Sequence, residues 1–232
     1  MRVLSIDTST EAASVAVIEE NKLLCEININ HKLQHSVILM EEIDKTLSYL
    51  KMSLDDIDGF VLSKGPGSFT GLRIGAAVIK GLSQGSGKRF IAVSSLDGLA
   101  NNLNFSDGII ISMIDALRDK VYARFYSALS GIKYESEIML IEIDELISIA
   151  GTYPKVIFIG DGSTKYKERL KTLSNAQFAP PSSNLCRASS LGEIGIKLLN
   201  EGKSDDIFTF TPLYINKCYA EKELENKEKS HA

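Results

Sequence analysis

Several polar side chains follow directly after the first apolar run of the sequence. Asp7 is followed by Thr8, Ser9 and Thr10, so a carboxylate and three hydroxyl groups stand where the chain must turn. Such a turn can hold a phosphate or a metal ion, and we take Asp7, Ser9 and Thr10 as candidate nucleotide- or phosphate-binding residues. The alternative is that these hydroxyl groups only hydrogen-bond the backbone of the turn.

Asp115 repeats this arrangement in the second half of the chain, directly after the apolar residues 109–114. It has the same two interpretations, and we add it to the candidate nucleotide-binding residues. A carboxylate at the matching place in two halves of a chain favours a ligand between them, because sites often lie where two lobes meet.

A glycine-rich run, GPGSFTGLRIG, covers residues 65–75. It joins a predicted strand to a predicted helix, where unpaired backbone N–H groups and the helix dipole favour an anion. We therefore take Gly65, Gly67 and Ser68 as further candidate phosphate-binding residues. The run is not a Walker loop. A tight turn followed by a helix with a face of small residues explains the glycines equally well.

Two predicted helices, residues 35–50 and 69–82, carry apolar or small positions that one face against a sheet does not require. The second helix has small residues on one stripe, which permits close approach of another helix. We predict a partner interface there, covered by a second copy of this chain when it is alone. The candidate interface residues are Val37, Met40, Gly71, Gly75 and Val78. The alternative is that Gly75 packs against its own lobe.

No catalytic or metal-binding set can be assembled from the sequence. His31 and His35 are four residues apart, as two ligands on one helix would be, but no third ligand is near. Cys25, Cys186 and Cys218 are widely spaced and form no CxxC pair, which argues against a disulfide framework or a zinc site. The remaining histidine lies near the C-terminus, so no Ser-His-Asp set is indicated. We predict no catalytic residue and no metal ligand.

The elements that position the candidate residues occur in an order that the chain repeats. In the first half we predict strands at residues 3–6, 13–18, 22–29, 60–63 and 90–93, and helices at 35–50, 69–82 and 95–103. In the second half we predict strands at 109–114, 120–127, 133–140 and 155–159, and helices at 142–150, 165–173 and 189–200. The order β-β-β-α-β-α therefore predicts two α/β lobes, residues 1–104 and 105–232, with a charged tail from about residue 221.

Length and composition agree with a globular protein of this kind. The 232 residues are 44% hydrophobic and 24% charged, which suits two small lobes and excludes a disordered or fibrous chain. The net charge of −4 argues against a protein that binds nucleic acid unaided. The longest apolar stretch, residues 108–114, is too short to span a bilayer, and we expect a cytoplasmic protein.

The motifs above resemble a known family. The polar turn at residues 4–10, the glycine-rich run at 65–75 and the VSSL sequence at 93–96 resemble the signature of the actin-like ATPase superfamily, and within it of the bacterial TsaB (YeaZ) family of tRNA threonylcarbamoyladenosine biosynthesis proteins. The resemblance implies two actin-like (ribonuclease H-like) lobes, each with a mixed sheet. Leu117 departs from the family pattern, which has arginine there, so no role is carried onto that position.

The resemblance also implies a function, that of a non-catalytic partner subunit. Such a subunit binds and activates a TsaD-like paralogue, which holds the metal and transfers the threonylcarbamoyl group to the adenosine beside the tRNA anticodon. A TsaE-like protein supplies ATPase activity. The resemblance therefore assigns ATP and metal to the partner proteins, no cofactor to the isolated chain, and contact with tRNA only through the complex.

Two other classes of function stay open. An actin-like small-molecule kinase or ATPase would use Asp7 and Asp115 with ATP and magnesium, and the isolated chain would then bind nucleotide tightly. A peptidase, the historical label of the wider family, would need a metal or a nucleophile that the sequence does not offer.

Overall fold

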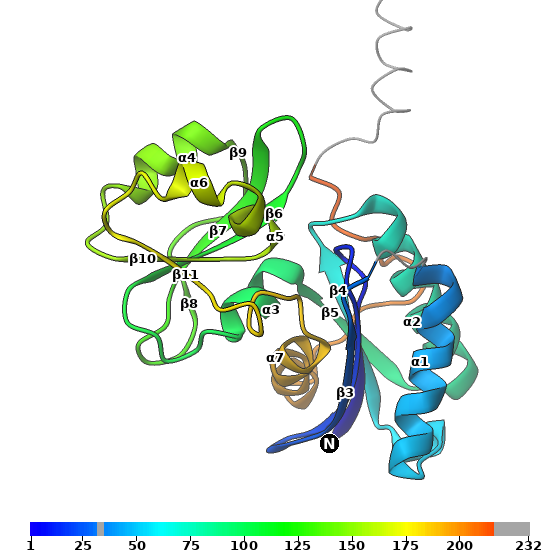
Figure 1. Ribbon diagram of the computed structural model, residues 1–232. Helices are drawn as coiled ribbons and strands as arrows, with labels where there is room; N and C mark the ends of the chain where they lie inside the picture. Colours follow the sequence, from blue (N-terminus) through cyan, green and yellow to red (C-terminus); the bar gives the residue numbers. More distant parts are fainter. Residues whose placement is uncertain (32–34, 216–232) are drawn as a thin grey trace, which may run out of the picture.

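The chain folds into two lobes, each built on one mixed β-sheet, in a computed structural model that describes residues 1–31 and 35–215, without the side chains of 35–37 (Figure 1). The first lobe contains β1 (Arg2–Asp7), β2 (Ala13–Glu19), β3 (Lys22–Ile29), α1 (His35–Leu50), the 3₁₀ helix η1 (Leu54–Asp56), β4 (Gly59–Gly65), α2 (Phe69–Ser86), β5 (Arg89–Ser94) and α3 (Ser95–Asn101). The second half contains β6 (Ile109–Asp115), β7 (Lys120–Ser127), β8 (Lys133–Tyr134), β9 (Met139–Glu142), α4 (Ile143–Ala150), β10 (Val156–Ile159), α5 (Asp161–Lys165), α6 (Lys167–Leu170), β11 (Ala176–Phe178) and α7 (Ala188–Asn200).

The sheet of the first lobe has the order β3-β2-β1-β4-β5. The meander β1-β2-β3 is antiparallel, and β4 and β5 continue the sheet in parallel with β1. Strand β1 is buried along nearly its whole length, because helices cover both faces of the sheet at its centre. The polar turn after Asp7 and the glycine-rich loop after β4 therefore lie at the same edge of the sheet.

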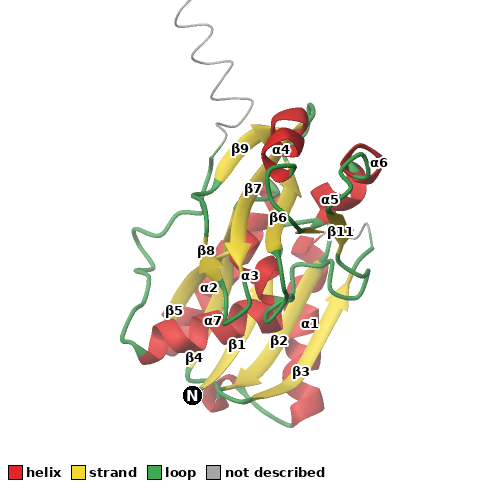
Figure 2. Ribbon diagram, turned by 90° about the vertical axis from the view of Figure 1, so that its left-hand side faces the viewer, coloured by secondary structure: helices red, strands yellow, loops and turns green. Residues whose placement is uncertain are grey.

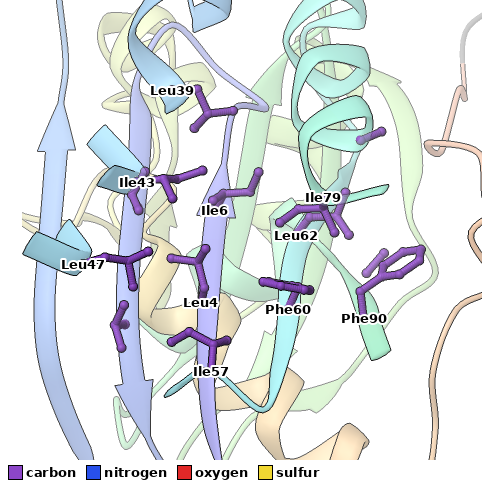
Figure 3. Close-up of a cluster of buried hydrophobic side chains, with 14 of the residues drawn as sticks. Leu4, Ile6, Leu39, Ile43, Leu47, Ile57, Phe60, Leu62, Ile79 and Phe90 are labelled. Atoms are coloured by element: carbon purple, nitrogen blue, oxygen red, sulfur yellow. The ribbon is translucent and has the colours of Figure 1, made fainter. Parts of the chain in front are cut away.

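One face of this sheet forms the main core of the lobe. Leu4, Ile6, Phe60 and Leu62 project from β1 and β4 toward α1 and α2 (Figure 3). The helices contribute Leu39, Ile43, Leu47 and Ile79 to the same cluster. Their spacing of three or four residues gives α1 the apolar stripe that the sequence predicts.

The second sheet repeats this plan, with the order β11-β10-β6-β7-β8 and with β9 also paired to β7 (Figure 2). Strands β6 and β7 are antiparallel, and β10 is parallel to β6, which confirms the predicted strands at residues 109–114 and 120–127 and shows that they pair. Asp7 and Asp115 end β1 and β6, as predicted. The repeat of topology is therefore real, although the two copies differ in detail.

Two predicted elements of the second half differ in the structure. Residues 133–140 form two short strands, because the Ser136 hydroxyl accepts a hydrogen bond from the Phe125 amide at 3.0 Å and interrupts the ladder. The helix predicted to begin at residue 165 begins earlier, because residues 161–164 are already helical in α5, and α6 follows after a break at Tyr166. The short strand β11 was not predicted, since three residues carry too little periodicity.

The chain after residue 187 does not remain with the second lobe. Helix α7 packs against β1, β2, β4 and β5, on the face of the first sheet opposite α1 and α2 (Figure 1). Leu191, Ile196 and Leu199 of α7 form a cluster with Val3, Val61 and Val93. The boundary near residue 104 stays a prediction. The prediction that all of residues 105–232 belong to a second lobe is corrected, because α7 packs on the first lobe. The apolar face of α7 therefore covers this face of the sheet beside α3, which also contacts β4 and β5.

Residues 205–215 continue along the first lobe as an extended strap. Asp205 accepts a hydrogen bond from the Ala92 amide of β5 at 2.7 Å, and the Leu213 amide donates to the Lys64 carbonyl at 2.7 Å. Phe210 enters the main core. The predicted charged tail lies outside the described residues. Within the described ranges, no helix has the length and apolar character needed to cross a membrane.

Candidate functional site

The turn after β1 encloses the carboxylate of Asp7. Asp7 is fully buried, and it accepts hydrogen bonds from the Ser9 amide at 2.9 Å and from the Ser9 hydroxyl at 3.0 Å. Burial raises the pKa of Asp7 to about 6, while hydrogen bonds from Ser9 and the Ser63 hydroxyl act in the opposite direction. The carboxylate therefore holds the turn through Ser9, and the predicted phosphate-binding role of Asp7 and Ser9 stays a prediction.

The glycine-rich loop lies directly against this turn. The Ser68 amide donates to the Ser9 carbonyl at 2.7 Å, and a Cβ on Gly67 would come within 2.1 Å of that same oxygen. Gly65 has a φ of +99°, a conformation that L side chains rarely adopt. Ser68 caps α2 by accepting a hydrogen bond from the Gly71 amide. Glycine is therefore needed for close packing, and the Ser68 and Gly71 amides already have partners within the chain.

Asp115, the second strand-end carboxylate, has a cationic partner of its own. Lys165 of α5 places its Nζ 2.7 Å from Asp115 Oδ2, and the Tyr166 hydroxyl lies 3.3 Å from Oδ1. Asp161, at the start of α5, accepts hydrogen bonds from the Asp115 and Gly162 amides. Asp7 is thus enclosed in the first lobe, whereas its counterpart Asp115 forms an ion pair with Lys165 at the surface of a cavity.

A cavity of about 1040 Å³ separates the two lobes at these turns. Five of the seven candidate nucleotide- or phosphate-binding residues line it: Ser9, Thr10, Gly67, Ser68 and Asp115. Asp7 and Gly65 are buried and do not line the cavity. Apolar side chains form much of the remaining lining, among them Leu99, Ile114, Tyr122 and Leu185. A cleft with an apolar lining and a few convergent polar groups is typical of a small-molecule site.

Other residues of this cavity were not among the candidates. Glu11 lines it from the first lobe, and Asp161 and Lys165 line it from the second. The surrounding cavity wall, together with the charges of Asp115 and Glu11, raises the pKa of Asp161, although its side chain is exposed and accepts two backbone hydrogen bonds. The sequence did carry a signal, because residues 160–164 repeat the position of the glycine-rich loop in the second half.

The predicted interface residues on α2 divide between two faces. Gly71 and Gly75 face their own lobe: the Thr8 hydroxyl donates to the Gly71 carbonyl at 2.8 Å, and a Cβ on Gly75 would lie 2.5 Å from Thr8 Oγ1. The prediction that Gly71 and Gly75 face a partner is therefore corrected, since both residues bring α2 close to β1. Val78 is half-buried and contacts the main core.

The outer face of α2 has a different set of small residues. Ala77, Gly81 and Gly85 are exposed and four residues apart, and neither glycine has an atom within 4 Å of the position of a Cβ. Met40 of the neighbouring helix α1 is 50% exposed. Val37 belongs to α1, but its side chain lies outside the described part of the structure. Helices α1 and α2 pack against each other, and we call the outer sides of the two helices, which carry Met40, Ala77, Gly81 and Gly85, the α1–α2 face.

The described residues contain no group of three or more His, Cys, Asp or Glu side chains that could hold a metal ion. His31 is exposed at the end of β3, and the side chain of His35 is not described. Cys25 and Cys186 are free thiols, and Cys218 lies outside the described residues. The prediction that the chain has no metal ligand and no catalytic residue stays a prediction.

Comparison with known proteins supplies the family. Residues 22–223 match the family model "TsaD: tRNA N6-adenosine threonylcarbamoyltransferase". The chain is 29% identical to the tRNA threonylcarbamoyladenosine biosynthesis protein TsaB of Bacillus subtilis, over 95% of this chain and 96% of that protein. It is 31% identical to TsaB of Buchnera aphidicola subsp. Schizaphis graminum, over 71% of this chain and 80% of that protein.

A solved structure has the same fold. It is that of a protein from Pseudomonas aeruginosa described as similar to peptidase YEAZ, with a TM-score of 0.79, 25% identity, and coverage of 93% of this chain and 99% of that one. This similarity, with the two mixed sheets, confirms the predicted actin-like α/β fold. The chain therefore belongs to the TsaD family of tRNA threonylcarbamoyladenosine biosynthesis proteins, and within it to the TsaB proteins.

Proposed function

We propose that this chain acts in the synthesis of threonylcarbamoyladenosine in tRNA as a partner subunit that has no catalytic activity of its own. It binds and activates a TsaD-like paralogue. The names of its relatives support the pathway. The observation that carries the partner role is that both strand-end carboxylates of the cleft are already engaged by groups of the same chain.

The state of these carboxylates argues against chemistry in the cleft. In phosphoryl transfer, carboxylates hold magnesium ions or accept a proton from the nucleophile. Asp7 is enclosed and bonded to Ser9, and Asp115 is paired with Lys165. Neither carboxylate is therefore available for a magnesium ion without rearrangement. The anion site at the start of α2 is also partly filled, since Ser9 and Ser68 accept the amide hydrogens there.

The α1–α2 face is the proposed docking surface for the paralogue. Small residues at intervals of four permit a helix of the partner to approach α2 closely, and an exposed methionine adapts to different partners. A paralogue of like fold presents equivalent helices. The same face pairs two copies of this chain when the paralogue is absent.

The remaining components follow from this role. ATP and metal belong to the TsaD-like and TsaE-like proteins, and tRNA contacts this chain only within the complex. The net charge of −4 supports this division, because a chain that bound tRNA alone would need a surplus of basic side chains. We place the complex in the cytoplasm, where tRNA is modified.

Reconstitution tests the proposal. Purified TsaD-like and TsaE-like proteins are incubated with tRNA, ATP and an activated threonylcarbamoyl donor, with and without this chain, and the modified nucleoside is measured by mass spectrometry. We expect modification to depend on this chain and to survive the change Asp115→Asn. Full modification of the tRNA without this chain would contradict the proposed partner role. Rapid ATP turnover by the chain alone would favour the actin-like kinase or ATPase.

A further inference from the structure

The guanidinium group of Arg73, near the start of α2, is held in place by two aromatic side chains. Its carbon Cζ lies 3.8 Å from the centroid of the Phe69 ring, one turn earlier on the same helix. Its Nε donates a hydrogen bond to the Tyr214 hydroxyl at 3.2 Å. The Phe69 and Tyr214 rings are themselves in contact, with centroids 5.0 Å apart. Stacking and a hydrogen bond therefore restrict a side chain that otherwise has many rotamers.

Tyr214 is in turn fixed by the backbone of the strap. The amide of the preceding residue, Leu213, donates to the Lys64 carbonyl of β4 at 2.7 Å. Farther back along the strap, the Phe210 carbonyl accepts a hydrogen bond from Lys80 of α2 at 2.7 Å. The strap therefore follows α2, and the hydroxyl that positions Arg73 belongs to an anchored segment.

The two Nη groups of Arg73 are left for an acceptor outside the chain. Arg73 is exposed, and within the described ranges its one hydrogen bond is that of Nε, while Nη1 and Nη2 form neither a hydrogen bond nor an ion pair. Other arginines of the protein do have a carboxylate partner in the chain, namely Arg2, Arg124, Arg169 and Arg187. Arg73 is thus a positioned guanidinium group whose terminal donors are unused.

The position of Arg73 connects it to the proposed docking surface. Arg73, Ala77, Gly81 and Gly85 are all exposed and lie four residues apart, so they form one row along the surface of α2. The last three belong to the α1–α2 face. A partner helix that packs along this row would reach Arg73 at its end.

We propose that Arg73 is an anchor of this docking surface and binds a carboxylate of the TsaD-like paralogue through its two Nη groups, an inference that rests on the proposed function. The planar guanidinium group offers parallel N–H donors that match the two oxygens of a carboxylate. Because Phe69 and Tyr214 already hold the side chain, little conformational entropy is lost on binding. Arginine is also among the residues that most often dominate the binding energy of an interface.

A phosphate of tRNA offers similar oxygens, but the surroundings favour a protein carboxylate. Binding to a nucleic acid needs several cations along one surface, whereas the neighbours of Arg73 in its row are an alanine and two glycines, and the net charge of the chain is −4. Small residues beside an arginine suit the close approach of a helix that carries an acidic side chain.

A series of charges at this one position tests the proposal. The affinity of the full chain for the purified TsaD-like paralogue is measured by isothermal titration calorimetry, without tRNA, for the wild type, Arg73→Lys, Arg73→Gln and Arg73→Glu. Arg118→Gln is the matched control, because Arg118 is exposed in the β6–β7 turn and, within the part of the chain that the structure describes, has no ion pair. Tyr214→Phe removes the hydroxyl and leaves the charge. Circular dichroism melting of each variant checks the fold.

We expect Arg73→Gln to weaken binding about tenfold to a hundredfold, as a charge-assisted hydrogen bond is lost. Arg73→Glu should bind more weakly still, because two carboxylates would then face each other. Arg73→Lys should lie between the wild type and Arg73→Gln, since it keeps the charge and loses the paired donors. Tyr214→Phe should weaken binding several-fold without a lower melting temperature, and Arg118→Gln should bind as the wild type does.

Wild-type affinity of Arg73→Gln would overturn the proposal. Equal affinities of Arg73→Gln and Arg73→Glu would overturn it as well, because no carboxylate would then face this position. A loss seen only after tRNA is added would assign Arg73 to an RNA phosphate instead. If a variant melts abnormally, the comparison rests on Arg73→Lys, which keeps a cation beside the Phe69 ring. Failure of the wild type itself to bind the paralogue would contradict the proposed function, so the two failures are distinguishable.

Discussion

At the scale of single residues, the carboxylate of the polar turn is engaged within its own chain. Asp7 stands where an actin-like enzyme would present a carboxylate to its ligand, yet its side chain is fully buried and bonded to Ser9. A buried carboxylate without a cation is costly, because burial disfavours the charged form. The raised pKa of Asp7, about 6, expresses that cost.

This cost predicts a stabilising substitution. The raised pKa means that the folded state binds the proton more tightly than the unfolded state, so stability falls as the pH rises from about 4 to about 6. Asp7→Asn keeps an acceptor for Ser9 and removes the charge. We expect its free energy of unfolding at pH 8 to exceed that of the wild type by roughly 1–3 kcal/mol.

Urea denaturation at pH 8 and at pH 3.5 checks this prediction. The difference between the two proteins should shrink at the lower pH, where the wild-type carboxyl is protonated in both states. A variant that is less stable than the wild type at pH 8 would show that the ionised carboxylate stabilises the turn.

A second prediction at this scale concerns Gly75. A side chain at this position would meet the Thr8 hydroxyl at 2.5 Å, where α2 packs on the end of β1. We expect Gly75→Leu to destabilise the fold by roughly 3 kcal/mol or more, because overpacking forces the two elements apart. Thermal unfolding followed by circular dichroism measures the loss. A normal melting temperature would show that the helix can shift at low cost.

At the scale of elements, α2 packs on its own sheet with one face and leaves the other face for the proposed association. Gly71 and Gly75 bring the helix onto its own sheet, whereas Gly81 and Gly85 are open to solvent. Helix α7 is also fixed to this sheet, at its start. Glu26 of β3 accepts hydrogen bonds from the Ser189 amide at 3.0 Å and from Arg187. Close contacts with the first sheet therefore fix the packing of both helices.

Gly81→Leu tests the outer face of α2. The substitution removes a glycine from a helix and meets no atom of its own chain within 4 Å, so we expect an unchanged or slightly raised melting temperature. Pairing with a second copy and with the TsaD-like paralogue should weaken on the order of a hundredfold, as a few kcal/mol of helix packing is lost. Sedimentation and pull-down measure this, with Ser148→Leu on α4 as the matched control. Normal pairing by Gly81→Leu would exclude this face.

The contact between Glu26 and α7 gives a prediction at the same scale. Hydrogen bonds from Arg187 and Ser189 hold the pKa of Glu26 below its usual range, although burial acts against them. Glu26→Ala leaves Arg187 and the first amides of α7 without this partner and should cost roughly 2–4 kcal/mol. Glu26→Gln keeps an acceptor and should cost less. Because the pKa is lowered, the contribution is present above the ordinary pKa of a glutamate and is lost as the pH falls through the lowered value.

Urea denaturation of the two Glu26 variants, with Glu20→Ala as an exposed control, measures these costs. Equal stability of Glu26→Ala and the wild type would show that α7 is held by its apolar face alone.

At the scale of the whole molecule, the cleft between the lobes has the lining of a small-molecule site. Its walls come from matching turns of two lobes, but the carboxylates of both turns are engaged within the chain. We expect the isolated protein to hydrolyse ATP no faster than a protein-free blank, measured by phosphate release with magnesium present. Asp115→Ala should leave this result unchanged. Turnover that this substitution abolishes would assign catalysis to the cleft.

The sequence by itself determined the order of the elements and the places of the polar turns. Apolar runs that alternate with helical periodicity fix strands and helices locally, so β1 and β6, their terminal aspartates and the first helices followed from the residues alone. The interrupted strand at residues 133–140 did not, because one hydroxyl from a neighbouring residue broke the ladder.

Only the tertiary structure decided which of these residues are accessible. Helix α2 has small residues on both sides, so the sequence could not tell which stripe packs inward; the contact of Gly75 with Thr8 decides it. The return of α7 to the first sheet depends on an apolar sheet face that sequence neighbours leave uncovered. Burial of Asp7 and pairing of Asp115 with Lys165 likewise join residues far apart in the chain. Such contacts depend on how whole elements pack against one another, which a local sequence pattern does not predict.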